Sequence, residues 1–173
     1  MKIISWISLV LVVAAGIFSA CNKDENSDNV YNVSDSIFVL KASMSNFTEI
    51  TLGQIASDSS TDPAVAQYGA RMVLDHTNAQ QQLQSVAGKL GMTISNSLDQ
   101  QHQLLRDSLL TYKGFAFDSI YIHSQVRDHQ ETIHFFKNES AHGMQKEVRA
   151  YMYQVLPALN MHLQSAIGLS YQY

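Results

Sequence analysis

The chain has 173 residues, enough for one domain with a real hydrophobic core, and 11 basic and 15 acidic residues give it a formal net charge of −4. Lysine and arginine are scattered singly from Lys41 to Arg149, so no basic patch is present and nucleic acid is excluded as an expected partner. The single cysteine, Cys21, leaves the rest of the chain without a disulfide or a thiolate-based metal site.

The N-terminal residues have the order of an export signal. Lys2 precedes an apolar run that ends in Phe18-Ser19-Ala20-Cys21. A basic start, an apolar stretch and small residues before a cleavage point are typical of a signal peptide, whereas a membrane-spanning helix needs charged flanks on both sides. We therefore expect residues 1–20 to be a cleaved signal peptide.

The junction Phe18-Ser19-Ala20-Cys21 resembles the lipobox of bacterial lipoproteins, although phenylalanine replaces the usual leucine. The resemblance implies that Cys21 carries a lipid that holds the mature protein on a membrane. Asn22-Lys23-Asp24-Glu25 resembles the signal that sends Bacteroidota lipoproteins to the outer face of the outer membrane, and an ordinary acidic tether is the open alternative. We expect a cell-envelope location, with residues 21–33 as a flexible tether because their polar composition cannot form a core.

The domain predicted for residues 34–173 begins with two long helices. The first runs from Ser34 into the polar stretch 57–62, and the second follows Asp62-Pro63, a capping residue and a first-turn proline, and ends before Gly91. Inner positions recur at three- and four-residue steps, which is the period of a helix face. They are Phe38, Ala42, Ser45, Glu49, Leu52 and Ala56 in the first helix, and Val65, Met72, His76, Ala79, Leu83, Val86 and Leu90 in the second.

Three more helices are expected. A capping-box pattern at 97–100 opens a short helix through Leu110, and a long helix runs from a cap at Asp118 to just before Ser140. The last helix covers about 144–169, and Pro157 predicts a kink within it. The inner positions are Ile122, Val126, His129, Ile133 and Phe136 in the third long helix, and Val148, Tyr151, Val155, Ala158, His162, Ala166 and Leu169 in the fourth.

Four long helices, one short helix and no alternating strand pattern predict an all-α fold. The expected architecture is an antiparallel four-helix bundle with a short extra helix between the second and third long helices.

One ionisable residue lies on the inner face of each long helix, close to its middle: Glu49, His76, His129 and His162. Because mid-helix residues of an up-down bundle meet at the same height, these four side chains are expected to converge. Three imidazoles and a carboxylate suit zinc, copper or iron, and a divalent cation offsets the cost of burying them. The metal should be lost as the pH falls through the histidine range, near about 6.

The alternative is that these four residues hydrogen-bond to one another and to neighbours such as Tyr121 and Gln125, without a metal. His102 and His142 are expected to be solvated, and Asp75 and Asp128 to be surface charges. His123 and His134 lie off the inner stripe of the third long helix. Glu131 and His134 have the Glu-x-x-His spacing of di-iron proteins, but no second such motif is present, so di-iron chemistry is disfavoured.

No motif in the sequence predicts a reaction. It contains no glycine-rich phosphate loop, no Gly-x-Ser-x-Gly elbow and no calcium loop. A redox or hydrolytic metalloenzyme is therefore only the third interpretation, after a metal-binding protein and a non-catalytic bundle.

Four segments together resemble the family named domain of unknown function 4142. They are the stretch from Phe38 to Ala56, Ala70-Arg71-Met72-Val73 with Asp75-His76-Thr77, the stretch from Phe117 to His129, and Leu156-Pro157 with His162-Leu163. The similarity spans about 35–170. It implies a ferritin-like four-helix bundle of a bacterial envelope protein and singles out Glu49, His76, His129 and His162, but it implies no settled activity.

Two functions follow for testing. The first is a lipid-anchored envelope protein that binds one transition metal ion for capture, buffering or sensing. The second is a structural or interaction bundle of the outer membrane that binds no metal and uses its buried polar residues for fold specificity. The sequence identifies no protein partner.

Overall fold

The structure, a computed structural model, describes residues 33–139 and 145–173, which form helices without any strand. The helices are α1 (Val33–Ser59), α2 (Pro63–Leu90), α3 (Gln100–Thr111), α4 (Gly114–Glu139) and α5 (Lys146–Ser170). The all-helical prediction is confirmed, and each expected helix is present. The predictions for residues 1–32, including the signal peptide and Cys21, and for His142 fall outside the described residues.

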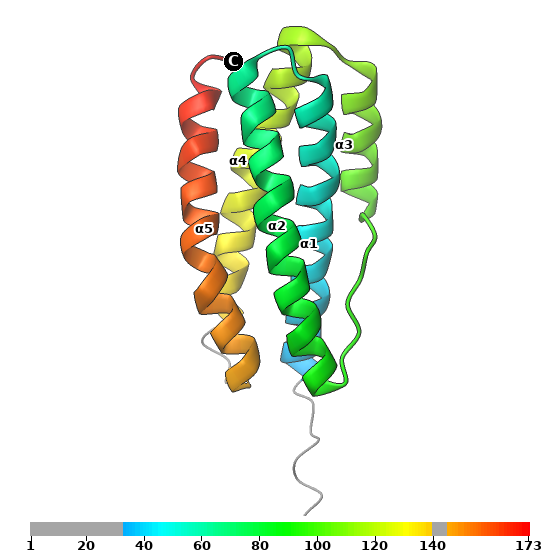
Figure 1. Cartoon of the computed structure of the whole chain (residues 1–173), viewed down its shortest axis with the longest axis vertical. Helices are drawn as coiled ribbons and strands as arrows, with labels where there is room; N and C mark the ends of the chain where they lie inside the picture. Colours follow the sequence, from blue (N-terminus) through cyan, green and yellow to red (C-terminus); the bar gives the residue numbers. More distant parts are fainter. Residues whose placement is uncertain (1–32, 140–144) are drawn as a thin grey trace, which may run out of the picture. The chain divides into compact units, whose positions relative to one another are not determined.

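The four long helices lie side by side, as Figure 1 shows. Helix α1 packs against α2 and α4, and α5 packs against the same two helices. The short helix α3 lies outside this group, against α1 and α4. Helix α5 continues through Pro157 without a break.

Local signals set the helix ends. Asp62 accepts a hydrogen bond of 2.7 Å from the Ala64 amide, and Gly91, with a φ of 64°, donates to carbonyls of the last turn of α2. Two expectations were wrong. The N-cap of α3 is Asp99, not Ser97 at the start of the 97–100 pattern. Asp118 does not cap α4 but lies inside it, where it accepts a hydrogen bond of 2.5 Å from Ser60 Oγ.

The core contains a polar layer between two apolar clusters. One cluster, which includes Phe38, Leu83 and Phe136, fills one end, and the other, which includes Leu52 and Phe117, fills the opposite end. Between them, along each long helix, lie the buried polar side chains of Asn46, Glu49, His76, Gln125, His129 and His162. Burial of a polar group costs free energy unless the group has a hydrogen-bond partner, so this layer is the candidate functional site of the bundle.

Helices α1 and α2 touch through glycine. A Cβ atom added at Gly53 would lie 2.8 Å from the Gly69 carbonyl oxygen, and one added at Gly69 would lie 2.7 Å from the Gly53 carbonyl oxygen. Only glycine permits this approach of two backbones. The contact holds the two helices close together one turn away from Glu49 and two turns from His76.

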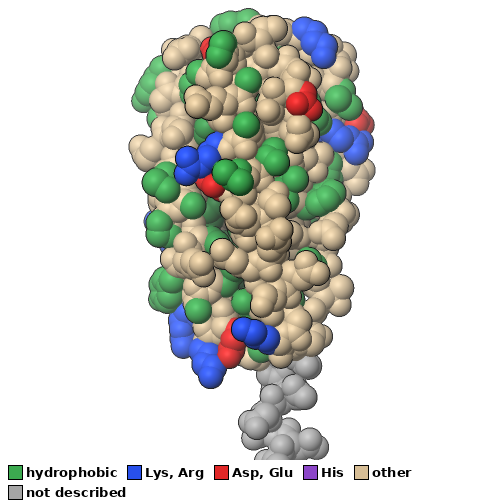
Figure 2. Space-filling model, viewed as in Figure 1, with side chains coloured by type: hydrophobic (Ala, Val, Ile, Leu, Met, Phe, Trp, Pro, Cys, Tyr) green, Lys and Arg blue, Asp and Glu red, His purple; other side chains and the backbone are tan. Residues whose placement is uncertain are grey.

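No helix among the described residues is long and apolar enough to cross a membrane. On the face shown in Figure 2, lysine and arginine side chains are scattered among polar and apolar ones, as expected from the sequence.

Candidate metal centre

Three histidines from three helices meet inside the bundle. His76 comes from α2, His129 from α4 and His162 from α5, and their side chains are 3%, 2% and 4% exposed. One nitrogen atom of each ring lies within 4.8 Å of the corresponding atoms of the other two. The expected convergence of these histidines is therefore present, and the three could together bind a metal ion.

The His76 ring is oriented by Asn46 on α1. Its Nδ1 lies 3.0 Å from Asn46 Oδ1. The Asn46 amide nitrogen donates to Gln80 Oε1 at 3.2 Å and to the Tyr151 hydroxyl at 3.0 Å, so its oxygen must accept. His76 thus carries its proton on Nδ1. Its Nε2 is buried, and the lone pair on this atom has no hydrogen-bond partner.

The other two rings are fixed in the same way. His129 Nδ1 donates to the backbone carbonyl of Gln125 at 3.0 Å, which leaves Nε2 without a proton. His162 Nε2 donates to Asp75 Oδ2 at 2.8 Å, which leaves Nδ1 without one. Arg71 hydrogen-bonds the same carboxylate oxygen, so Asp75 is itself held in place. Metal-binding histidines are commonly oriented by such partners on their second nitrogen.

The free nitrogens point at each other. His129 Nε2 and His162 Nδ1 are 3.4 Å apart. Neither atom carries a proton, because each neutral ring has its single proton on its other nitrogen, which donates to another acceptor. Two ligands on one tetrahedral metal ion, with bonds of about 2.0–2.1 Å, are separated by about 3.3–3.4 Å. This pair already has the spacing of a metal-bound pair, and His76 offers a third nitrogen within 4.8 Å of the ligand atoms of the other two rings.

The environment keeps all three rings neutral. Burial, followed by the repulsion from the other two rings, lowers the pKa of His76 well below its usual value. Burial and His162 lower the pKa of His129 to about 4. Burial also lowers the pKa of His162, although the bond to Asp75 opposes this shift. A neutral imidazole is the form that binds metal, so the site is ready for a cation at neutral pH.

Glu49 is buried but stands apart from this group. Its Oε1 lies 3.8 Å from Nδ1 of His129, the nitrogen already bound to Gln125, and its Oε2 has no partner. Burial, with a contribution from Asp128, raises the pKa of Glu49 to about 8. The structure therefore brings together three of the four expected ligands and places Glu49 on the far side of His129.

Three residues expected at the surface have other positions. Asp75 orients His162, and Asp128 is only 7% exposed. His102 is half-buried and bonded to Asp99 at 2.8 Å, and the nearby Asp128 is the main cause that raises its pKa to about 9. His123 and His134 are exposed, which agrees with their expected position off the inner stripe of α4.

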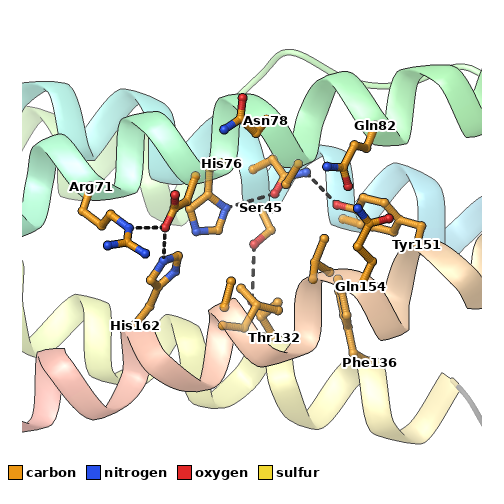
Figure 3. A pocket seen from close by; sticks show the side chains of 17 residues that line it. Ser45, Arg71, His76, Asn78, Gln82, Thr132, Phe136, Tyr151, Gln154 and His162 are labelled. Carbon is orange, nitrogen blue, oxygen red and sulfur yellow. Dashed lines mark hydrogen bonds and ion pairs between the residues drawn. The ribbon is translucent and has the colours of Figure 1, made fainter.

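A pocket of about 220 Å³ opens beside the centre, between α2 and α5. In Figure 3, His76 and His162 face it from opposite walls, with Tyr151 and Gln154 farther along. Neither His129 nor Glu49 lines it. A ligand can therefore reach the centre from the side of His76 and His162.

The profile described as Domain of unknown function (DUF4142) matches residues 21–169. The chain belongs to the DUF4142 family. No curated protein matches this DUF4142 chain. Among solved structures, it is similar to the crystal structure of a DUF305 fragment from Deinococcus radiodurans, with a TM-score of 0.73 and 13% sequence identity. The similarity covers 82% of this chain and 98% of the other, and at this identity it supports the fold alone.

Sequence reasoning missed the residues that orient the rings of this DUF4142 site. Asn46 lies three residues before Glu49 on the inner face of α1, and this spacing was a usable signal. Asp75 gave no usable signal, because its partner His162 lies on another helix and 87 residues away.

Proposed function

We propose that this protein holds one transition metal ion on His76, His129 and His162, and that it serves in metal capture, buffering or sensing at the bacterial envelope. The observation that carries the proposal is a set of three buried, neutral imidazoles that offer nitrogen atoms within 4.8 Å of one another, while one nitrogen of each ring is held by an acceptor. Unpaired buried lone pairs cost free energy, and a cation removes that cost.

The ligand chemistry favours zinc, copper or iron. Imidazole nitrogen suits borderline metals, whereas calcium and magnesium prefer oxygen ligands. Since Glu49 lies behind His129, three protein ligands would leave one coordination position open toward the pocket between α2 and α5. An open position lets the metal be handed over to another ligand, which fits capture or buffering better than a closed structural site.

The envelope location rests on the N-terminal sequence. The signal-like residues 1–20 and the lipobox-like junction at Cys21 support a lipid anchor, with the outer membrane as its place. The ferritin-like arrangement of the bundle is part of the same proposal, and the packing of α1 and α5 each against both α2 and α4 supports it.

Metal content tests the proposal. The full chain in detergent is equilibrated with zinc, copper or iron, freed of excess metal and analysed for bound metal. Wild type should retain about one equivalent of at least one metal, and the triple variant His76→Ala, His129→Ala, His162→Ala should retain almost none. His123→Ala, which removes an exposed histidine from α4, is the matched control.

The same assay distinguishes the non-metal alternative. A wild type that binds no more than about 0.1 equivalent of each metal would sink the proposal, as would a triple variant that binds as well as wild type. Circular dichroism of the triple variant shows whether its helices are retained, and a chelator-treated wild type provides the same comparison without a substitution.

A further inference from the structure

The segment 91–99, which joins α2 to α3, is attached to α1 and α2 at Ser95 (Figure 1). The Ser95 amide donates to Ser43 Oγ at 2.8 Å, and the Ser43 hydroxyl donates to the Leu40 carbonyl, also at 2.8 Å. The Ser95 carbonyl accepts from Gln80 Nε2 at 3.3 Å. Ser43 is fully buried and Gln80 is only 8% exposed, so both sides of the Ser95 backbone are bonded to buried side chains.

Gln80 links this segment to the metal centre. It lies one turn after His76 on α2, and its Oε1 accepts from Asn46 Nδ2 at 3.2 Å. Asn46 Oδ1 in turn lies 3.0 Å from His76 Nδ1. A continuous chain of hydrogen bonds therefore runs from the Ser95 carbonyl through Gln80 and Asn46 to the His76 ring.

The direction of this chain is fixed at its Ser95 end. A backbone carbonyl can only accept, so the Gln80 amide must turn its nitrogen toward Ser95 and its oxygen toward Asn46. The second proton of Gln80 Nε2 goes to Asn96 Oδ1 at 3.0 Å. Asn46 must then turn its nitrogen toward Gln80 and its oxygen toward His76, which places the His76 proton on Nδ1 and leaves Nε2 for a metal.

Tyr151, the other partner of the Asn46 amide nitrogen, cannot set this direction. Asn46 Nδ2 donates to the Tyr151 hydroxyl at 3.0 Å, but a hydroxyl can donate as well as accept. If the Asn46 amide were turned over, Tyr151 could donate to its oxygen, whereas Gln80 Oε1 would face that oxygen as a second acceptor. The turned amide would donate to His76 Nδ1, and the ring proton would move to Nε2, where it blocks a metal.

We propose that Gln80 is a positioning residue of the metal centre, through which the segment 91–99 sets the tautomer of His76 and thereby the metal affinity. This inference rests on the metal site proposed above and adds to it a residue that hydrogen-bonds none of the three histidines. Loss of a group that orients a metal-binding histidine typically weakens metal binding by about 10–100-fold.

The tautomer is measured by nitrogen NMR on the metal-free full chain in detergent, with labelled histidine. The signals of His76 are those that His76→Ala lacks. Wild type should carry the His76 proton on Nδ1. Gln80→Met, which keeps the size of the side chain but neither donates nor accepts strongly, should place a substantial share of it on Nε2 and raise the Kd for zinc by about 10–100-fold.

Gln80→Glu is the conservative variant. In either protonation state it keeps an oxygen that accepts from Asn46, so it should retain the wild-type tautomer and bind zinc more tightly than Gln80→Met does. A purely structural role of Gln80 predicts the reverse order, because burial of a carboxyl group costs more than burial of a thioether. Gln84→Met, at an exposed position of α2, is the matched control and should resemble wild type.

Tyr151→Phe removes the partner that does not set the direction, so it should retain the wild-type tautomer, and it carries the test if Gln80→Met fails to fold. A wild-type tautomer in Gln80→Met, a changed tautomer in Gln80→Glu or Tyr151→Phe, or unchanged zinc affinity in Gln80→Met would each overturn the proposal. Because the tautomer is measured without metal, this result is distinct from that of the metal-content assay, whose failure would overturn the proposed function.

Discussion

Single buried side chains decide what the polar layer can do. Each imidazole is held in one tautomer by a hydrogen-bond acceptor: the Asn46 amide for His76, the Gln125 backbone carbonyl for His129 and the Asp75 carboxylate for His162. Glu49, by contrast, has one oxygen without a hydrogen-bond partner. The histidines could be picked out from the sequence because they fall on the inner stripe. The tautomers could not, since they depend on contacts between different helices.

Protonation of the three rings would set the acid limit of the proposed metal binding. The sequence alone predicts loss of metal near about pH 6, but the lowered pKa values of all three histidines, about 4 for His129, move this limit down. Protons compete with a metal only below the pKa of the folded protein. Bound metal, measured after dialysis at a series of pH values, should therefore persist at pH 6 and fall below about pH 5. Loss centred at pH 6 or above would contradict the burial of these rings.

Glu49 should make the metal-free protein less stable as the pH rises. Its pKa is raised from 4.5 to about 8, so between these values the folded state holds a proton that the unfolded state has released. The contribution of this proton is complete below pH 4.5 and is lost as the pH rises toward 8. Glu49→Gln, which mimics the protonated form, should then be more stable than wild type at pH 8, by on the order of a few kcal/mol.

Urea unfolding at pH 5 and pH 8 measures this difference. The variant and wild type should be close at pH 5 and should separate at pH 8. Glu131→Gln, at an exposed position of α4, provides the control and should show no such separation. An equal effect of Glu49→Gln at both pH values would show that the carboxyl is not protonated in the folded state.

At the scale of helices, the most specific contact is between the backbones of α1 and α2. Gly69→Ala should destabilise the protein by about 1–3 kcal/mol, because its Cβ would meet backbone atoms of α1 that cannot move aside without separating the helices. Gly88→Ala is the matched control in the same helix, since an added Cβ there meets nothing within 4 Å. It should be neutral or stabilising by about 0.5–1 kcal/mol. Thermal unfolding of both variants checks the pair, and equal effects would argue against the close contact.

Helix existence and approximate bounds were predictable because the apolar period and the residues at Asp62, Pro63 and Gly91 are local signals. The exact start of α4 was not predictable from the sequence. Asp118 has the residue type of a helix cap, but it lies inside α4 and accepts a hydrogen bond from Ser60. The closeness of α1 and α2 was not predictable either. A glycine in a helix has several possible causes, and only the neighbouring backbone identifies this one.

At the scale of the whole molecule, the N-terminal sequence makes Cys21 the attachment point. In cells fed labelled palmitate, wild type should carry the label and sediment with membranes. Cys21→Ala should lose both, because the chain contains no other cysteine. Ser19→Ala, a change to another small residue at the same junction, should keep the label. Persistent labelling of Cys21→Ala would rule out the lipoprotein interpretation.

The distribution of the site over the helices also sets the order of events during folding. His76, His129 and His162 come from α2, α4 and α5, and Asn46, which orients His76, comes from α1. No fragment that lacks a long helix can assemble the complete centre, and the last ligand arrives only with the C-terminal helix. If the centre binds metal as proposed, its complete ligand set forms only when α5 has docked, so the rate of specific uptake by a refolding chain should report the docking of this final helix.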